Sequence, residues 1–304
     1  MKKLGEILKH IIVPLVTPFK RQNQDVDYAA TEKLVDHLIR DRLCDSILVA
    51  GTTGEFNTLS FEERVELFRA AKGAADGRVP MVAGTGAAST RETILLTQKA
   101  EEMGYDCAMI VAPYYCRPTQ EEILEHFKMV ARQTGIRIML YNIPLFTGVN
   151  IDPATVAGLT ELDNILGIKD EAGLNPTQMT EYARVTPDRF TIYNGDDIMV
   201  LCGMAQGAAG VVSGGSHVIG TQMKQMIELF LAGKHEQARE IHMSLDPLFK
   251  ALPPPGGVNP IPALKAAVEM TGIPVGPPRL PLLESSAEHK KILRKHLERV
   301  GVLP

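Results

Sequence analysis

The feature that most constrains the fold is an alternation of short apolar runs with longer segments of helical period, which repeats along most of the chain. Eight runs rich in β-branched residues are candidate strands, at 11–16, 46–50, 79–83, 107–112, 137–141, 165–169, 190–194 and 210–212. Apolar residues at three- and four-residue spacing mark helices between them, for instance at 28–42, 61–74, 90–103 and 120–134. This alternation is typical of βα units and predicts a parallel sheet.

The number of repeats distinguishes two architectures. Eight strand-helix repeats in roughly 230 residues match a (β/α)8 TIM barrel, whereas a doubly wound open sheet usually has about five to seven strands. An open sheet that binds dinucleotides also has a glycine-rich turn after its first strand, and the turn here reads Thr17-Pro18-Phe19. We therefore predict an α/β protein with a catalytic TIM barrel over residues 1–232. A two-domain α/β protein is the alternative.

The remaining segment, residues 233–304, loses the strand pattern. It reads as helices interrupted by a proline-rich stretch at 252–257. We predict a C-terminal helical extension packed on the barrel. Two helix starts carry the capping-box pattern: Ser60 stands three residues before Glu63, and Thr119 three residues before Glu122.

Composition narrows the class of protein. The 304 residues are 45% hydrophobic, which suffices for a substantial core, and their net charge is −4 without a basic block, which argues against a nucleic-acid partner. No run of eighteen apolar residues could span a membrane, and the N-terminus lacks a signal-peptide pattern. Four cysteines without C-x-x-C spacing predict free thiols in a cytoplasmic protein. The histidines form no H-x-H or H-E-x-x-H pattern, so we expect neither a metal nor another cofactor.

Reactive groups of a TIM barrel lie at the carboxyl ends of its strands. Lys169 closes one apolar run, and it would lose hydration if its side chain pointed into the barrel. A free lysine is neutral about once in a few thousand molecules at pH 7, and desolvation raises that fraction. Such a lysine can attack a ketone and form a Schiff base. The alternative is a lysine that faces solvent or pairs with Asp170.

Other strand ends supply matching groups. Tyr115 and Tyr141 could move protons through their phenol hydroxyls, bridged by a threonine hydroxyl. The turn of Gly51, Thr52, Thr53 and Gly54 could present amides and hydroxyls to a carboxylate. A single tyrosine at a strand end is more often a packing residue than a catalytic one. The convergence of Tyr115 and Tyr141 with Lys169 favours catalysis. Asp196 and Asp197 begin a predicted helix, so we expect helix capping there.

Several motifs together resemble one family in order and spacing. They are L-V-T-P-F at 15–19, G-T-T-G-E at 51–55, A-G-T-G at 83–86, P-Y-Y at 113–115, Y-N-I-P at 141–144, G-I-K-D at 167–170 and N-G-D-D at 194–197. The chain resembles the dihydrodipicolinate synthase / N-acetylneuraminate lyase family from about residue 11 to its C-terminus. The resemblance implies a class I, pyruvate-dependent aldolase on a (β/α)8 barrel with extra C-terminal helices. It also implies a homotetramer built as a dimer of dimers.

The resemblance implies roles for five side chains. Lys169 matches the Schiff-base lysine, and Tyr141 matches the tyrosine that exchanges protons beside it. Thr52 and Thr53 match the pair that binds the pyruvate carboxylate, with Thr52 also linking the tyrosines. Tyr115 matches a relay tyrosine that reaches across a dimer interface into the neighbouring site.

The resemblance also covers the lining of the pocket, where Gly195 and Val212 match positions that present backbone groups to pyruvate.

One position departs from the pattern of the family. Synthases of the family have an arginine two residues after the proline of Y-N-x-P, which receives the carboxylate of the aldehyde, whereas this chain has Phe146. Loss of a charged partner for that carboxylate would cost several kcal/mol.

These observations rank the functions. The leading expectation is reversible aldol cleavage or condensation of a 2-keto-3-deoxy sugar acid through a pyruvate Schiff base on Lys169, with Phe146 on the acceptor side. One alternative is dihydrodipicolinate synthase itself, with another residue binding aspartate semialdehyde. Another is a keto-deoxy sugar acid dehydratase, which would use Lys169 but release water. A barrel that binds without catalysing is a last alternative, disfavoured because the lysine and both tyrosines are present.

Overall fold

Eight parallel strands pair in chain order around a closed barrel in the computed structural model, which describes residues 2–171, 175–254 and 256–304. The strands are β1 (Ile11–Pro14), β2 (Ser46–Val49), β3 (Met81–Gly84), β4 (Cys107–Val111), β5 (Ile138–Asn142), β6 (Ile165–Asp170), β7 (Thr191–Asn194) and β8 (Val211–Val212). The predicted TIM barrel is confirmed, and each strand lies within two residues of its predicted bounds. Pro255, in the predicted proline-rich interruption, lies outside the described residues.

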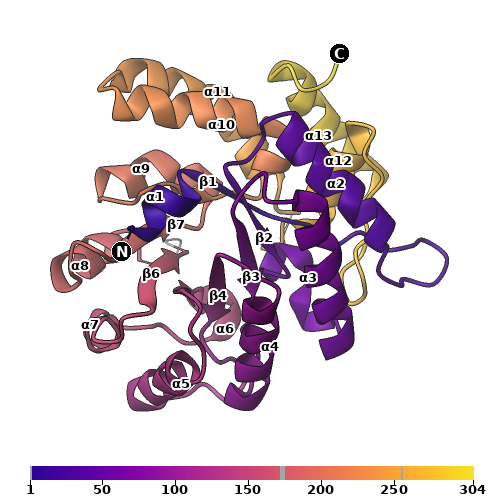
Figure 1. Cartoon of the computed structure of the whole chain (residues 1–304). Coiled ribbons are helices and arrows are strands. Elements are labelled where there is room, and N and C mark those ends of the chain that lie inside the picture. The colour runs from indigo at the N-terminus through magenta and orange to yellow at the C-terminus, as the bar shows by residue number, and fades with distance from the viewer. Residues whose placement is uncertain (1, 172–174, 255) are drawn as a thin grey trace. The chain divides into compact units, whose positions relative to one another are not determined.

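The chain divides into two compact units, Met1–Ile12 with Pro80–Val212 and Val13–Val79 with Ser213–Pro304. The predicted boundary between residues 232 and 233 stays a prediction. In the first unit the strand residues are buried throughout, as expected where both faces of a parallel sheet are covered. Its helices are α1 (Leu4–Leu8), α4 (Thr90–Glu102), α5 (Gln120–Arg132), α6 (Pro144–Thr147), α7 (Pro153–Leu159), α8 (Gln178–Val185) and α9 (Val200–Ala205), with the 3-10 helix η3 (Asp197–Met199). Figure 1 shows α4 and α5 side by side on its outer surface.

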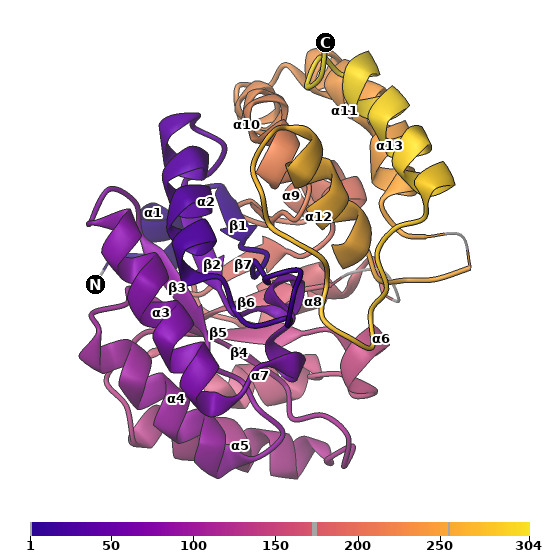
Figure 2. The same ribbon diagram turned by 90° about the vertical axis from the view of Figure 1, so that its right-hand side faces the viewer.

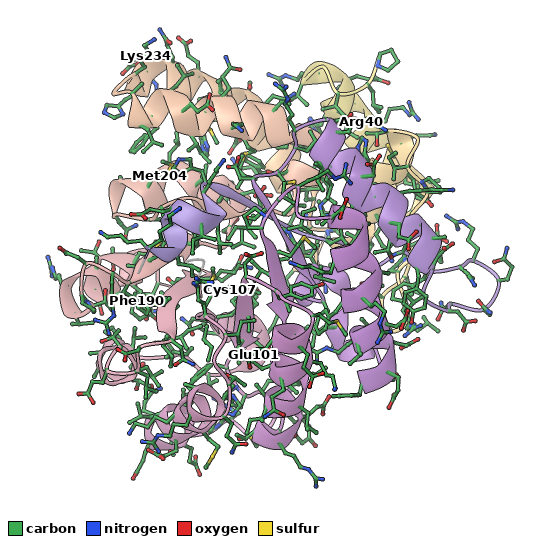
Figure 3. All side chains as sticks on the ribbon, in the orientation of Figure 1. Arg40, Glu101, Cys107, Phe190, Met204 and Lys234 are labelled. Carbon is green, nitrogen blue, oxygen red and sulfur yellow. The ribbon has the colours of Figure 1, made fainter. Side chains whose placement is uncertain are left out.

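The second unit contains β2 and most of the chain's longest helices. They are α2 (Tyr28–Arg40), α3 (Phe61–Ala75), α10 (Ser216–Leu231), α11 (His235–Ala251), α12 (Ile261–Met270) and α13 (Ala287–Arg299), with 3-10 helices η1 (Thr52–Gly54) and η2 (Phe56–Thr58). Helices α11 to α13 make up the C-terminal helical segment, and α11 lies beside α13 (Figure 2). Lys234 lies at the turn between α10 and α11 (Figure 3). In the described part of the chain, no helix combines the length and apolar character needed to cross a membrane.

Helix starts follow their sequence signals. Both capping boxes form as predicted: Ser60 Oγ accepts from the Glu63 amide at 3.1 Å, and Thr119 Oγ1 accepts from the Glu122 amide at 3.3 Å. Helix α2 was predicted to reach residue 42 but ends at Arg40. Arg42 has a φ of 57°, a left-handed conformation that cannot continue a helix.

Candidate active site

Lys169 and Tyr141 lie opposite each other on the adjacent strands β6 and β5. Only 5% of Lys169 is exposed, and its Nζ lies 4.1 Å from the centroid of the Tyr141 ring. Asp170 points to the other side of the strand, where its Oδ1 accepts from Asn142 Nδ2 at 2.9 Å and from Gln178 Nε2 at 3.3 Å. The alternative in which Lys169 faces solvent or pairs with Asp170 is therefore wrong, and the lysine faces inward beside a phenol.

A carboxylate that the sequence analysis missed contacts this lysine. Glu171 Oε2 lies 3.5 Å from Lys169 Nζ, and the glutamate side chain is 22% exposed. The period of two along a strand places residues 169 and 171 on the same face, so the signal was available once β6 was recognised. Asp196 caps η3 as expected, by accepting from the Ile198 amide at 3.3 Å.

The electrostatics of the lysine differ from the expectation. Burial lowers the pKa of Lys169, but Tyr141 and Glu171 raise it by more, so the pKa lies above its ordinary value. The loss of hydration alone predicts a lowered pKa for Lys169, which is the wrong sign because the two neighbouring groups outweigh it. Burial raises the pKa of Glu171 to about 7; Lys169 opposes this shift, while Asp196 and Asp197 add to it.

Gly195 makes room for the lysine and the glutamate. It follows β7, and its amide donates to the Asp170 carbonyl at 2.8 Å. A Cβ at this position would lie 2.5 Å from Glu171 Oε2 and 2.6 Å from Lys169 Cε, which is closer than real Cβ contacts allow. The predicted site residue Gly195 therefore joins Lys169 and Tyr141 in one cluster. Val212 ends β8, where it is buried and pairs with Ile12.

Phe146, the residue expected on the acceptor side, lies on the short helix α6, directly after β5. Phe146 is 41% exposed and its neighbour Leu145 is 50% exposed, whereas Thr147 is buried. The helix ends at Gly148, which has a φ of 73°. The Arg117 side chain lies alongside this turn. Its Nε would be 3.7 Å from a Cβ added at Gly148. An exposed guanidinium therefore lies next to the helix that carries Phe146.

Tyr115 is not part of the Lys169 cluster within its own chain. It is 95% exposed, and its φ is 76°. A positive φ is a genuine outlier for a bulky side chain and costs on the order of 1–3 kcal/mol. The structure thus holds a strained tyrosine projecting into solvent.

The threonine pair belongs to the second unit. Thr52 and Thr53 form the 3-10 turn η1 directly after β2, preceded by the buried Gly51, and both are half-buried. Thr17 Oγ1 donates to the Gly54 carbonyl at 2.6 Å, which fixes the far end of the turn. The predicted turn therefore forms directly after β2, and the hydrogen bond from Thr17 braces its backbone.

A buried ionic network that the sequence analysis did not find holds the residue after this turn. Glu55 is 1% exposed and has a left-handed φ of 56°. Its Oε1 accepts from Lys265 Nζ at 2.9 Å, and its Oε2 accepts from the Arg279 amide at 2.8 Å. Lys265 Nζ and Arg279 Cζ lie 4.2 and 4.4 Å from the Phe19 ring centroid. Burial lowers the pKa of Lys265 to about 8.

His217, five residues after the end of β8, has a structural role. His217 Nε2 accepts from the Val16 amide at 3.2 Å, and Nδ1 donates to the Gly214 carbonyl at 2.8 Å. Within the described ranges, no group of three histidine, cysteine or acidic side chains is placed to hold a metal ion.

Comparison with known proteins gives a consistent result. Residues 7–300 match the model of the Dihydrodipicolinate synthetase family. A 4-hydroxy-tetrahydrodipicolinate synthase of Desulforudis audaxviator is 44% identical over 96% of this chain and 98% of its own. The 4-hydroxy-tetrahydrodipicolinate synthase 1 of Halalkalibacterium halodurans is 45% identical over 93% of this chain and 94% of its own.

Solved structures agree. Dihydrodipicolinate synthase DapA-2 of Bacillus anthracis superposes with a TM-score of 0.90 at 43% identity, covering 96% of this chain and 98% of that one. The lysine-bound enzyme of Cyanidioschyzon merolae has a TM-score of 0.92 at 41% identity, covering 98% and 99%. With the family model, these matches establish that the chain belongs to the dihydrodipicolinate synthetase family, as a class I pyruvate-dependent aldolase.

Proposed function

We propose that the protein is a 4-hydroxy-tetrahydrodipicolinate synthase, which condenses pyruvate with aspartate semialdehyde. The observation that carries the proposal is the identity of 44% to a synthase of that name across 96% of the chain. The comparisons favour this alternative over the cleavage of a keto-deoxy sugar acid, which the sequence analysis placed first.

Lys169 is the proposed nucleophile. Its Nζ attacks the keto carbon of pyruvate, and loss of water gives an iminium that acidifies the pyruvate methyl group. Loss of a methyl proton gives an enamine, whose carbon attacks the aldehyde. Tyr141 is the proposed proton carrier of the enamine and aldol steps, supported by its ring at 4.1 Å from Nζ. The iminium itself is the electron sink, so the proposed reaction uses no cofactor or metal.

The pyruvate carboxylate is the proposed ligand of the turn after β2. Thr52 and Thr53 supply hydroxyl donors, and the Gly51 to Gly54 backbone shapes the turn. Gly195 and Val212 are proposed to line the pyruvate site with backbone groups. For Gly195 the support is steric, since any side chain there would displace Lys169.

The aldehyde carboxylate needs a cationic partner, which Phe146 cannot be. We assign this role to Arg117, whose guanidinium lies beside Gly148 at the end of α6. A bidentate contact with a carboxylate suits arginine geometry. In a dihydrodipicolinate synthase with Phe146 in place of the usual arginine, Arg117 would then bind the carboxylate of aspartate semialdehyde.

Tyr115 is the proposed relay tyrosine of a neighbouring subunit in a homotetramer built as a dimer of dimers. Its exposure of 95% and strained backbone support a role outside its own chain. A related solved structure at 33% identity is described as a monomeric variant of dihydrodipicolinate synthase, so light scattering has to decide the oligomer here. A tetramer is expected, and a fully active monomer would remove the role of Tyr115.

A coupled assay tests the proposed reaction. Purified protein is mixed with pyruvate, aspartate semialdehyde and a reductase that consumes the product. Turnover that requires both substrates is the expected result. No turnover with the semialdehyde, together with turnover of glyceraldehyde, would overturn the proposal.

The second candidate is aldol chemistry on a 2-keto-3-deoxy sugar acid, favoured by one observation: the apolar Phe146 on α6. In that reaction the acceptor aldehyde, for example glyceraldehyde, carries no carboxylate. It therefore needs no cationic side chain at the position of Phe146. Mass analysis of products separates cleavage, which releases pyruvate, from dehydration, which releases water.

A further inference from the structure

We propose that Glu171 is a catalytic base and acid of imine formation: it takes the proton from the Lys169 ammonium and returns it to the hydroxyl that leaves as water. The inference rests on the Schiff base of the proposed function but not on the identity of the aldehyde.

The geometry places the carboxylate against the reacting nitrogen. Glu171 Oε2 lies 3.5 Å from Lys169 Nζ. The Glu171 amide donates to the Asn142 carbonyl at 3.0 Å, which anchors its backbone to the end of β5. Gly195 leaves the space that both side chains occupy, since a Cβ there would collide with Glu171 Oε2 and Lys169 Cε.

The chemistry needs such a base. An amine with the ordinary lysine pKa of about 10.4 is an ammonium near pH 7, and an ammonium cannot attack a ketone until it loses a proton. A neutral phenol such as Tyr141 is a weak proton acceptor near pH 7, because phenols ordinarily ionise near pH 10. A carboxylate in contact with Nζ is the better acceptor.

The environment of Glu171 allows it both to accept and to donate a proton near neutral pH. Burial, Asp196 and Asp197 raise the pKa of Glu171 to about 7, and Lys169 opposes them. Tyr141 faces the lysine from β5. Near neutral pH both protonation states are populated, which is the condition for efficient general acid-base catalysis.

The proton balance closes over the step. Lys169 transfers one ammonium proton to the Glu171 carboxylate and becomes a neutral amine. The amine attacks the keto carbon, and a proton passes from nitrogen to oxygen to give a carbinolamine. Protonated Glu171 donates to the carbinolamine hydroxyl, which leaves as water while the nitrogen lone pair forms the iminium. Ammonium and ketone have become iminium and water, and Glu171 is again a carboxylate.

Imine trapping tests the inference without any aldehyde. Pyruvate and borohydride are added to the protein, and the rate of adduct formation is followed by intact mass from pH 5.5 to about pH 8.5. We expect Glu171→Gln to slow trapping at pH 7 by about 10²-fold, at the low end of what general acid-base catalysis contributes. The matched control is Glu181→Gln, the same change at an exposed position of α8.

The pH profile distinguishes a catalytic from a structural role. Trapping by the unaltered protein should rise with pH through a midpoint near the pKa of Glu171, about 7, and Glu171→Gln should lose this limb. Asp196→Asn keeps a capping side chain but removes a charge that raises the pKa of Glu171, so the midpoint should move to lower pH. Glu171→Asp should retain the limb at a reduced rate.

The outcomes separate this inference from the proposed function. If the unaltered protein forms no adduct, the Schiff base of the proposed function fails and the inference fails with it. If the unaltered protein forms the adduct, and Glu171→Gln matches its rate within twofold with an unchanged profile, the inference alone is overturned.

Discussion

Lys265 Nζ, on α12, donates a 2.9 Å hydrogen bond to Glu55 Oε1, and both side chains are almost completely buried. Glu55 directly follows the turn that presents Thr52 and Thr53. The C-terminal helical segment thus holds the backbone of a turn that lies 210 residues earlier in the chain. The pair thereby fixes the residue that follows Thr52 and Thr53, the turn for which we propose binding of the pyruvate carboxylate.

Lys265→Met should therefore destabilise the protein strongly. Removal of one partner leaves Glu55 charged and buried, which costs roughly 3–5 kcal/mol of unfolding free energy. Chemical denaturation measures it, and an increase in KM for pyruvate should accompany it. The control is Lys290→Met, whose partner Glu284 is 40% exposed and whose loss should cost at most about 1 kcal/mol. Equal losses in the two variants would contradict a special role for the buried pair.

Gly195→Ala should abolish imine trapping with pyruvate while the protein stays folded. The added Cβ would occupy space now held by Lys169 Cε and Glu171 Oε2. Gly73→Ala serves as the control, because a Cβ in this interior position of α3 meets nothing within 4 Å. The control should keep full trapping and gain about 0.5–1 kcal/mol in stability from its higher helix propensity. Normal trapping by Gly195→Ala would show that the crowding is relieved by movement.

Phe146→Arg should raise kcat/KM for aspartate semialdehyde by about tenfold or more, since a charged hydrogen bond contributes about 1.5–3 kcal/mol. Arg117→Leu should lower it by a similar factor, and neither change should alter pyruvate trapping. Leu145→Arg adds the same charge at the adjacent exposed position and should have little effect. A comparable gain in the Leu145 variant would indicate a general effect of charge on substrate attraction.

Acid should destabilise the fold through His217. Burial lowers the pKa of His217 to about 4, whereas the unfolded chain takes up this proton near pH 6.5. As pH falls from 6.5 to 4 the unfolded state is therefore favoured, by up to about 3 kcal/mol for this residue. Protonation would also remove the acceptor for the Val16 amide.

His217→Gln should flatten this part of the stability profile, measured by denaturant titrations between pH 4 and pH 7. His235→Gln, at the exposed start of α11, is the control and should leave the profile unchanged. An unaltered slope in His217→Gln would assign the acid sensitivity to other groups, of which the buried His126 is a candidate.

The fold was largely predictable because its signals are local. Strand residues of a parallel barrel are buried on both faces and read as short apolar runs, and capping boxes mark helix starts within four residues. The division of the chain into two compact units was not predictable, since it depends on packing between residues that are distant in the sequence. The end of α2 also escaped prediction, because nothing in the residue type of Arg42 indicates a left-handed backbone.

One member of the candidate site stands out in the sequence, because Lys169 is an unusual side chain at the end of an apolar strand. The predicted sign of the lysine pKa shift was wrong because the raising effects of Tyr141, on the neighbouring strand, and of Glu171, two residues further on, were left out. The Lys265–Glu55 pair could not be found from spacing, because its members come from distant segments. The place of Arg117 beside α6 likewise depends on a turn geometry that sequence does not specify.

The most direct test of Lys169 as the nucleophile is peptide mass mapping after incubation with pyruvate and borohydride, because reduction converts an imine into a stable adduct. We predict one pyruvate adduct per chain, carried by the peptide that contains Lys169 and lost in Lys169→Met. An adduct on a different lysine, or none at all with a folded protein, would contradict the assignment of Lys169 as the nucleophile.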